Sequence, residues 1–162
     1  MPEAVILAPQ WIAPVAPDPR VLTGHAVLVE DGRIAKLASF DALRERHPDV
    51  PLTLLPGQLL VPGFVNLHTH AAMSLLRGVA DDLPLHDWLR KRIWPLEGKL
   101  VSRAFVRDGA LLAAYEMLMG GTTCFNDMYF FPEESVAAAR QLGMRSMQGI
   151  IVIEFPSAYA SD

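Results

Sequence analysis

The second part of the chain limits the possible folds most, because strand-like apolar segments alternate there with longer helical segments. Ser102 is placed to cap the longest of these helices, and Gly120-Gly121 follows its end. The expected elements are, in chain order, a strand at 64–67, helices at 72–77, 85–93 and 103–119, a strand at 122–127, a helix at 133–142 and a strand at 144–153. This alternation is typical of an α/β fold in which crossover helices join parallel strands.

The number of strand–helix steps limits what this region can form by itself. Only about three steps fit between residues 62 and 162, whereas a closed (β/α)₈ barrel needs eight steps and about 250 residues. Three parallel strands alone would leave open sheet edges and an exposed apolar face. The sequence therefore predicts a unit over residues 62–162 that cannot close a barrel alone.

Residues 1–61 follow a different pattern, which predicts a small β-rich unit. Prolines at positions 9, 14, 17 and 19 argue against a regular central strand in that segment. The clearest hairpin signal is Asp31-Gly32, because both central positions of a type I′ turn need positive φ. The expected elements are a strand at 4–8, hairpin strands at 25–30 and 33–38, a short helix at 39–47, and strands at 52–55 and 58–61 around Pro56-Gly57.

Composition and charge exclude several classes of protein. Hydrophobic residues make up 51% of the 162 residues, which suits a globular core. The net charge of −4, with scattered Lys and Arg, argues against nucleic acid or an anionic membrane as a partner. No apolar run reaches the roughly 18 to 20 residues of a membrane helix, so we expect a cytoplasmic protein. The only cysteine, Cys124, is expected to be a small buried hydrophobe.

Two histidines, His68 and His70, stand one residue apart at the end of the first apolar strand of the second region. Side chains alternate along a strand, so both imidazoles are expected on one face, where they can bind one metal ion. The alternative is a pair of ordinary hydrogen-bonded histidines. A hydrolytic zinc site normally has three or more protein ligands and a water. The missing ligands are expected outside this chain, because the other three histidines are poorly placed.

Those other histidines have structural explanations. His25 begins a hairpin, and His47 precedes Pro48 at a helix end, so both are expected at the surface. His86 opens a helix in a segment shared with Trp88, and a pocket role for it stays open.

Polar residues near the pair are candidates for orienting it. Asn66 and Thr69 flank the histidines, and Asp127 ends the next strand, so its carboxylate is expected near the same face. Ligating imidazoles usually donate their second ring N–H to such an acceptor. Ordinary strand packing, or a helix-cap role for Asp127, is the alternative in each case.

Longer stretches carry a family resemblance. These stretches are the run from Pro62 to His70, Leu75-Leu76-Arg77-Gly78, Asp81 to Leu85 and Ile93 to Glu97. They resemble the amidohydrolase superfamily, in its chlorohydrolase and adenosine-type deaminase branch. The resemblance implies the N-terminal portion of a metal-dependent (β/α)₈ barrel over 62–162, and part of a small β-sandwich over 1–61. It also implies one divalent metal, zinc in most relatives, held in part by His68 and His70.

The implied activity is hydrolytic deamination of adenosine-like thionucleosides, 5-methylthioadenosine and S-adenosylhomocysteine. By resemblance, Glu97 is placed to accept hydrogen bonds from ribose hydroxyls, which a carboxylate can do for both hydroxyls of a cis-diol. Trp88, with Trp94 and Met73, would line an apolar wall, although such residues also serve as core. Gln148 stands where some relatives have a substrate-contacting arginine, and it is the substrate-facing candidate at that end of the pocket.

The implied proton shuttle and remaining metal ligands are absent from this chain, so it contains no complete catalytic set. The implied partners are a nucleoside substrate and either the remainder of the same polypeptide or a complementing fragment; a homo-oligomer is compatible with the resemblance. The competing hypotheses are guanine deamination or triazine hydrolysis on the same scaffold, and a noncatalytic metal-binding fragment.

Overall fold

The computed structural model describes residues 4–17, 19–154 and 156–160. The chain divides into two compact units, Met1–Pro62 and Gly63–Asp162, which are treated separately below. Within the described ranges, none of the helices combines the length and apolar character needed to cross a membrane.

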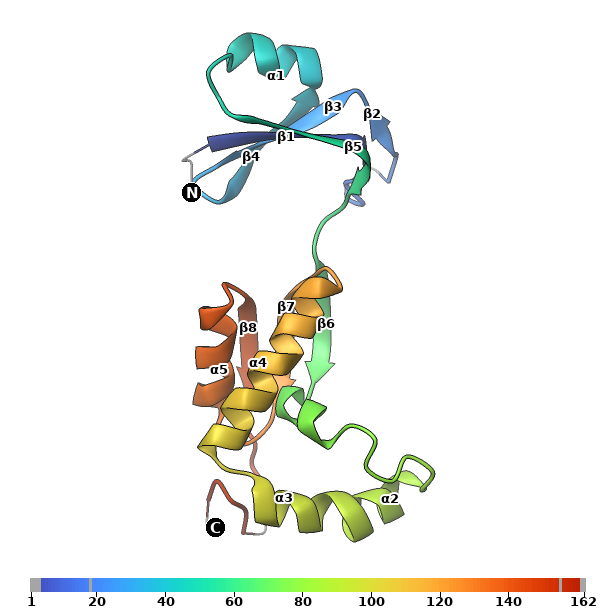
Figure 1. Cartoon of the computed structure of the whole chain (residues 1–162), viewed down its shortest axis with the longest axis vertical. Coiled ribbons are helices and arrows are strands. Elements are labelled where there is room, and N and C mark those ends of the chain that lie inside the picture. The colour runs from blue at the N-terminus through green and yellow to red at the C-terminus, as the bar shows by residue number, and fades with distance from the viewer. Residues whose placement is uncertain (1–3, 18, 155, 161–162) are drawn as a thin grey trace. The chain divides into compact units, whose positions relative to one another are not determined.

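The first unit is built around one mixed sheet. Strand β1 pairs antiparallel with β2 and β3, β3 pairs antiparallel with β4, and β5 lies parallel to β1 (Figure 1). The elements are β1 (Ala4–Ile12), β2 (Leu22–Thr23), β3 (His25–Glu30), β4 (Arg33–Ser39), α1 (Phe40–Arg46) and β5 (Leu52–Leu60). The expected hairpin is confirmed, and Asp31 and Gly32 have the positive φ values of 48° and 72° that a type I′ turn requires.

Helix α1 covers one face of this sheet. Its Leu43 is 2% exposed and packs against Ile6, Ala26 and Leu28 from the strands. Over the described residues this unit contains a single sheet, so the β-sandwich stays a prediction. Apolar side chains such as Ile34, which is 75% exposed, are available for a further layer.

Two expectations for this unit were wrong. Strand β1 continues through Pro9 to Ile12, and residues 52–60 form one strand instead of two around Pro56-Gly57. The pairing of β1 with β5 shifts between Pro9 and Trp11, so extra residues of β5 bulge opposite Gln10. The side-chain Oε1 of Gln10 accepts from the backbone N–H of Gly57 at 2.9 Å. A bulge absorbs the turn-forming residues without ending the strand.

The second unit has three parallel strands in the order β6-β7-β8. Figure 1 shows helices α4 and α5 lying beside this sheet, with the shorter helices beyond one end of it. The elements are β6 (Phe64–Thr69), η1 (a 3₁₀ helix, Ala71–Leu76), α2 (Leu85–Trp88), η2 (a π-helical turn, Leu89–Ile93), α3 (Trp94–Leu100), α4 (Arg103–Met119), β7 (Thr122–Met128), α5 (Pro132–Gln141) and β8 (Arg145–Gly149).

The core of this unit lies between the sheet and helices α4 and α5. Phe125 of β7 is fully buried against small residues of both helices, including Ala110, Ala114 and Ala138. The predicted cap of α4 is confirmed, because Ser102 Oγ accepts from the backbone N–H of Phe105 at 3.2 Å. Small side chains at these positions let the helices approach the sheet closely.

Among the residues that the structure describes, α4 and α5 pack against one face of the sheet, and apolar side chains of the strands are exposed on the other face. Val65 of β6 and Met147 of β8 are 56% and 69% exposed. Strand β8 is shorter than expected and ends at Gly149, and the helix expected at 85–93 continues to Leu100 through the π-helical turn. The exposed apolar face agrees with the expectation that this unit is incomplete by itself.

Candidate metal and substrate site

The first histidine of the pair lies in a β-bulge near the end of β6, and the second directly follows the strand. The register of β6 against β7 shifts between Asn66 and Thr69, so Leu67 and His68 both lie opposite Asn126. The Nδ2 atom of Asn126 donates to the carbonyl oxygen of Leu67 at 3.1 Å. Bulges change the direction of side chains and are frequent beside active sites. The simple alternation assumed from the sequence did not predict this one.

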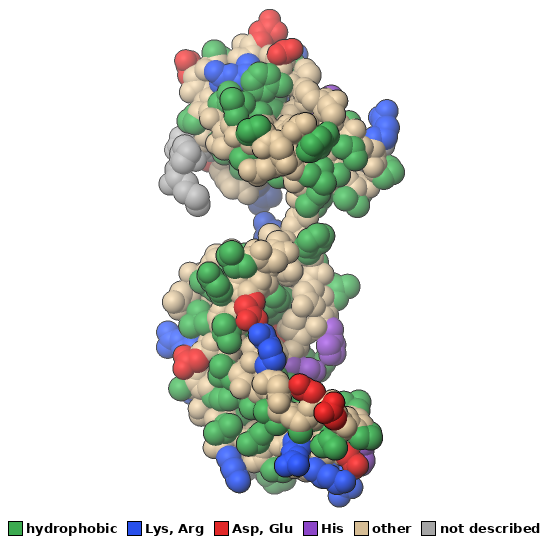
Figure 2. Space-filling model, turned by 45° about the vertical axis from the view of Figure 1, so that its right-hand side comes forward, with side chains coloured by type: hydrophobic (Ala, Val, Ile, Leu, Met, Phe, Trp, Pro, Cys, Tyr) green, Lys and Arg blue, Asp and Glu red, His purple; other side chains and the backbone are tan. Residues whose placement is uncertain are grey.

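The two imidazoles lie close together, and both residues are exposed at the surface of the unit. Histidine side chains are coloured purple in Figure 2. The ring centroids of His68 and His70 are 5.0 Å apart, and the rings meet edge to face at 83°. The Nδ1 atom of His70 is 2.6 Å from the carbonyl oxygen of Met128. A carbonyl can only accept, so Nδ1 carries the hydrogen and Nε2 keeps a lone pair for a metal.

This arrangement fits half of a metal site. The described residues contain no group of three His, Cys, Asp or Glu side chains that could hold a metal ion. Two imidazole nitrogens are suitable donors for zinc, which is commonly bound by four ligands. A metal held by His68 and His70 therefore needs further ligands from elsewhere.

The residues that flank the pair hold the backbone instead of the rings. Asn66 Oδ1 accepts from the backbone N–H of His68 at 3.2 Å. Thr69 Oγ1 lies 3.0 Å from the carbonyl oxygen of Asn126 and 2.9 Å from Asp127 Oδ1. The acceptor for the His70 ring is the Met128 carbonyl, which the sequence pattern did not indicate.

Asp127 occupies a buried position with three hydrogen-bond donors around it. Its Oδ1 atom accepts from Thr69 Oγ1 at 2.9 Å and from the backbone N–H of Ala71 at 2.8 Å. Its Oδ2 atom accepts from Ser135 Oγ at 2.8 Å. The side chain is fully buried and its hydrogen-bond partners are Thr69, Ala71 and Ser135 of α5, so of the two interpretations left open by the sequence these contacts favour the structural role over the orientation of a histidine ring. Asp127 instead joins the end of β6, the start of η1 and α5.

Glu97 meets a tyrosine that the sequence analysis did not select. Glu97 lies half-buried in α3, and Tyr129, which follows β7, donates its hydroxyl to Glu97 Oε1 at 2.7 Å. Burial raises the pKa of Glu97, while the Tyr129 hydrogen bond and the nearby His70 oppose that rise. Burial and the Glu97 carboxylate raise the pKa of Tyr129, so its hydroxyl remains a donor at neutral pH. The available signal for Tyr129 was its position directly after the carboxyl end of a strand of a parallel sheet, where functional residues are frequent in α/β folds.

A pocket of about 730 Å³ connects the candidate metal ligand to the candidate substrate residues. Its lining includes His70 from the end of β6 and Glu97 from α3. Trp88, Trp94 and Met73 contribute apolar surface to the same pocket. The structure therefore brings together five of the residues that the sequence selected.

Trp88 is held in place by a polar contact as well as by packing. Its indole Nε1 donates to the carbonyl oxygen of Val79 at 2.8 Å. Trp94, which also lines the pocket, is 43% exposed. An apolar wall of this kind suits a flat, partly apolar ligand.

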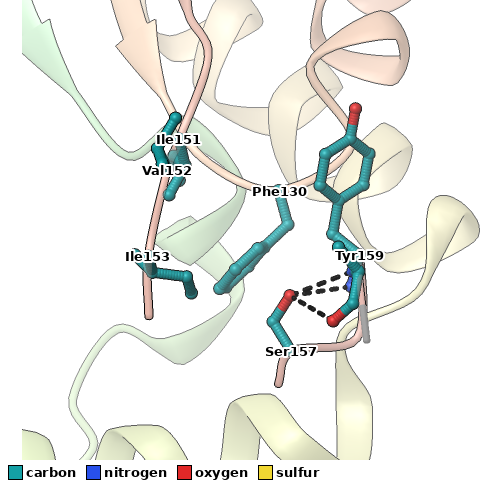
Figure 3. A pocket seen from close by; sticks show the side chains of 7 residues that line it. Phe130, Ile151, Val152, Ile153, Ser157 and Tyr159 are labelled. Atoms are coloured by element: carbon teal, nitrogen blue, oxygen red, sulfur yellow. Dashed lines mark hydrogen bonds between the residues drawn. The ribbon is translucent and has the colours of Figure 1, made fainter. Parts of the chain in front are cut away.

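A smaller pocket of about 250 Å³ shares several lining residues with the larger one. Figure 3 shows Phe130 pointing into it between Ile153 and Ser157. The Oγ atom of Ser157 accepts from the backbone N–H groups of Tyr159 at 3.2 Å and Ala160 at 3.1 Å. These bonds hold together the turn at 157–160, which lines the smaller pocket.

Gln148 lies elsewhere. It pairs in register with Asp127, and neighbouring residues of parallel strands point to the same face, so Gln148 points toward the helix-covered face. It is not among the residues that line either pocket above. Its Oε1 and Nε2 atoms are buried and have no hydrogen-bond partner among the described residues. The structure does not bring Gln148 to the candidate site.

The remaining histidines and the cysteine do not line the larger pocket. His25 Nδ1 lies 2.8 Å from the carbonyl oxygen of Thr23, His47 follows α1, and His86 lies in α2. Cys124 is a half-buried residue of β7, more exposed than the sequence analysis expected.

Comparison with known proteins assigns the family. A profile described as "Amidohydrolase family" matches residues 59–159, and one described as "Imidazolonepropionase-like composite domain, bacteria" matches residues 26–49. The chain belongs to the amidohydrolase family.

The chain is also similar to individual members of this family. It is 44% identical to the 5-methylthioadenosine/S-adenosylhomocysteine deaminase of Saccharophagus degradans over 160 residues, 99% of this chain and 36% of that protein. It is 56% identical to the enzyme of that name from Desulfovibrio desulfuricans over 143 residues, 86% of this chain and 31% of that protein. The chain thus spans about a third of the length of these curated relatives.

A solved structure is similar in fold as well as in sequence. The crystal structure of an adenosine deaminase from Xanthomonas campestris with bound zinc matches with a TM-score of 0.84 and 40% identity. The match covers 97% of this chain and 36% of that one.

Proposed function

We propose that this chain forms the N-terminal part of a metal-dependent deaminase that hydrolyses the amino group of adenosine-like thionucleosides. Its similarity to relatives named 5-methylthioadenosine/S-adenosylhomocysteine deaminase supports this choice of substrate class. The relatives are about three times longer, so we propose that the other metal ligands and the proton shuttle come from the rest of a (β/α)₈ barrel. That part is either the remainder of the same polypeptide or a complementing fragment.

The observation that carries the proposal is the shared pocket of His70 and Glu97. One residue offers an imidazole nitrogen for a metal, and the other offers a carboxylate. An ionised carboxylate can accept hydrogen bonds from both hydroxyls of a ribose cis-diol. A nucleoside anchored on Glu97 would place its base in the pocket that His70 lines, beside the proposed metal.

A divalent metal is part of the proposal. His68 and His70 would hold it, and when bound it supplies activation of a water for attack on a ring carbon. Zinc is the proposed ion, because two imidazoles suit it and the similar Xanthomonas campestris structure contains zinc. The other contributions of this chain are binding and orientation, with Trp88 and Trp94 as an apolar wall beside the base.

The test is turnover by the complete enzyme, meaning this chain together with the rest of its fold. Zinc-loaded enzyme is supplied with 5-methylthioadenosine, and ammonia release is followed together with the change from adenine to hypoxanthine absorbance. We expect deamination of the thionucleoside and little turnover of guanine or a chlorinated triazine. Turnover of guanine or triazine alone, or of none of the three, would overturn the proposal.

A further inference from the structure

Two consecutive residues, the last of β7 and the one that follows it, each form a hydrogen bond with a candidate functional residue of the pocket. Met128, the last residue of β7, accepts a hydrogen bond from the ring of His70 at 2.6 Å. Tyr129, the next residue, donates to the Glu97 carboxylate at 2.7 Å. A single short segment therefore fixes the position of a candidate metal ligand and of the candidate ribose acceptor.

We propose that Tyr129 is a positioning residue for nucleoside binding, whose hydroxyl orients the Glu97 carboxylate toward the ribose. This inference rests on the proposed function, because it assigns Tyr129 a role at the same site. Tyr129 acts through Glu97 and does not itself touch the reacting atoms.

The packing of Tyr129 makes it a rigid support. The residue is only 4% exposed and belongs to a buried cluster with Ala72, Val101 and Val106. Its ring also meets Phe130 edge to face, with centroids 5.1 Å apart. This packing fixes the position of the hydroxyl oxygen, from which the hydroxyl donates to Glu97 Oε1 at 2.7 Å.

The hydrogen-bond capacity of Glu97 leaves room for a substrate. An ionised carboxylate has about four acceptor positions, and Tyr129 occupies one of them on Oε1. The others remain available for the two hydroxyls of a cis-diol. Glu97 is half-buried on a helix, so without this donor its carboxylate would be free to rotate. Loss of the Tyr129 hydroxyl would therefore change the orientation of the carboxylate and leave the carboxylate itself in place.

The test is Tyr129→Phe in the complete zinc-loaded enzyme, which removes the hydroxyl and keeps the ring. We expect KM for 5-methylthioadenosine to rise about tenfold or more with kcat nearly unchanged, because a lost hydrogen bond to a charged group weakens binding in ground and transition states alike. Turnover of free adenine, measured in parallel, should not change. In a Glu97→Ala background, Tyr129→Phe should have no further effect on KM.

Tyr115→Phe is the matched control, because Tyr115 lies in α4 and is 56% exposed. It should leave KM and kcat unchanged. If the wild-type enzyme is active, three results for Tyr129→Phe would overturn this inference and leave the proposed function intact. They are an unchanged KM, an equal loss of activity with the nucleoside and with adenine, and a lower kcat with an unchanged KM. Wild-type enzyme that neither turns over the thionucleoside nor binds its deaminated product in calorimetry would overturn the proposed function, and this inference with it.

Discussion

At the residue scale, the account depends on Glu97 more than on any other side chain of this chain. It is the only carboxylate lining the larger pocket among the residues that the structure describes, and His70 lines the same pocket. Burial raises its pKa, because burial disfavours the charged form of the carboxyl group. A half-buried carboxyl group with a shifted pKa that shares a pocket with a candidate metal ligand is typical of a functional group.

The first prediction concerns the substrate preference of a Glu97 variant. Glu97→Ala should lower kcat/KM for 5-methylthioadenosine by about a hundredfold, because a charged partner of two ribose hydroxyls is worth several kcal/mol. It should have little effect on a free base, which has no ribose. Steady-state kinetics with adenosine-type nucleosides and with adenine checks this. Equal losses for both substrates would show that Glu97 acts on the reaction or on folding instead.

The second prediction concerns the pH dependence of stability in the metal-free enzyme. The pKa of Glu97 is raised from its ordinary value of 4.5, so the folded protein holds this proton more tightly than the unfolded chain. Its contribution to stability therefore falls as the pH rises from 4.5 through the raised pKa, and it stays low at neutral pH. Glu97→Gln keeps an acceptor for Tyr129 without the charge.

Glu97→Gln should thus be more stable than the wild type at pH 7, by no more than about 1 kcal/mol because the half-exposed group is screened by solvent. The gain should disappear on acidification below the ordinary carboxyl range. Thermal unfolding across a pH series measures it. A variant that is less stable than the wild type at neutral pH would contradict the account.

At the element scale, Asp127 connects β6, η1 and α5 through its three hydrogen bonds. The histidine pair lies at the end of β6, directly before η1, so these bonds set its position relative to the sheet. A fully buried carboxylate with three partners has a mainly structural role here.

The third prediction compares the loss of this group with the loss of one of its partners. Asp127→Ala should lower the free energy of unfolding by about 3 to 5 kcal/mol, because it removes three hydrogen bonds and leaves the buried donors of Ala71 and Ser135 without an acceptor. Ser135→Ala removes one bond and should cost about 1 to 2 kcal/mol. Thermal unfolding of the complete enzyme measures both. Equal effects of the two substitutions would contradict the role assigned to Asp127.

The fourth prediction concerns the close approach of α4 to η1. A Cβ atom added at Gly109 would lie 2.5 Å from the backbone oxygen of Ala72, so Gly109→Ala should cost about 1 to 3 kcal/mol through overpacking. Gly98 is also helical, and a Cβ atom there meets nothing within 4 Å. Gly98→Ala should therefore raise stability, by up to about 1 kcal/mol. Thermal unfolding of both variants measures these changes in stability. If Gly109→Ala raised stability, α4 would have to move away from η1 to make room for the added methyl group, which would contradict the prediction.

Much of the element pattern was predictable from the sequence because it depends on local signals. The Asp31-Gly32 turn and the Ser102 cap are determined by a few neighbouring residues, and both are confirmed. The strand through Pro9 was not predictable, since the bulge opposite Gln10 depends on a partner strand about 45 residues away. Local pattern carries no information about such a pairing.

The candidate site divides in the same way. His68 and His70 were recognisable by their spacing, and Glu97 by family resemblance. The contact of Tyr129 with Glu97 joins two elements that lie far apart in sequence, so no local pattern indicates it. Gln148 was also selected by family resemblance, because it stands where some relatives have a substrate-contacting arginine, and only the register with Asp127 shows which face it occupies.

At the scale of the whole molecule, the described residues of the unit 63–162 supply two candidate metal ligands and a pocket lined by one of them, but no group of three side chains that could hold a metal ion. Its sheet exposes apolar side chains such as Met147, which is 69% exposed, on the face without helices. The relatives that resemble this chain are about three times its length. These observations agree with a chain whose chemistry depends on further strands and ligands.

The most direct test of the account is the position of the metal and the nucleoside in the complete enzyme. Crystals grown with zinc and the deaminated product of 5-methylthioadenosine would locate the ion by its anomalous scattering. The account predicts one ion at about 2.0 to 2.1 Å from a ring nitrogen of both His68 and His70, with the ribose hydroxyls on Glu97. An ion bound away from these two rings, or a nucleoside whose ribose does not contact Glu97, would contradict it.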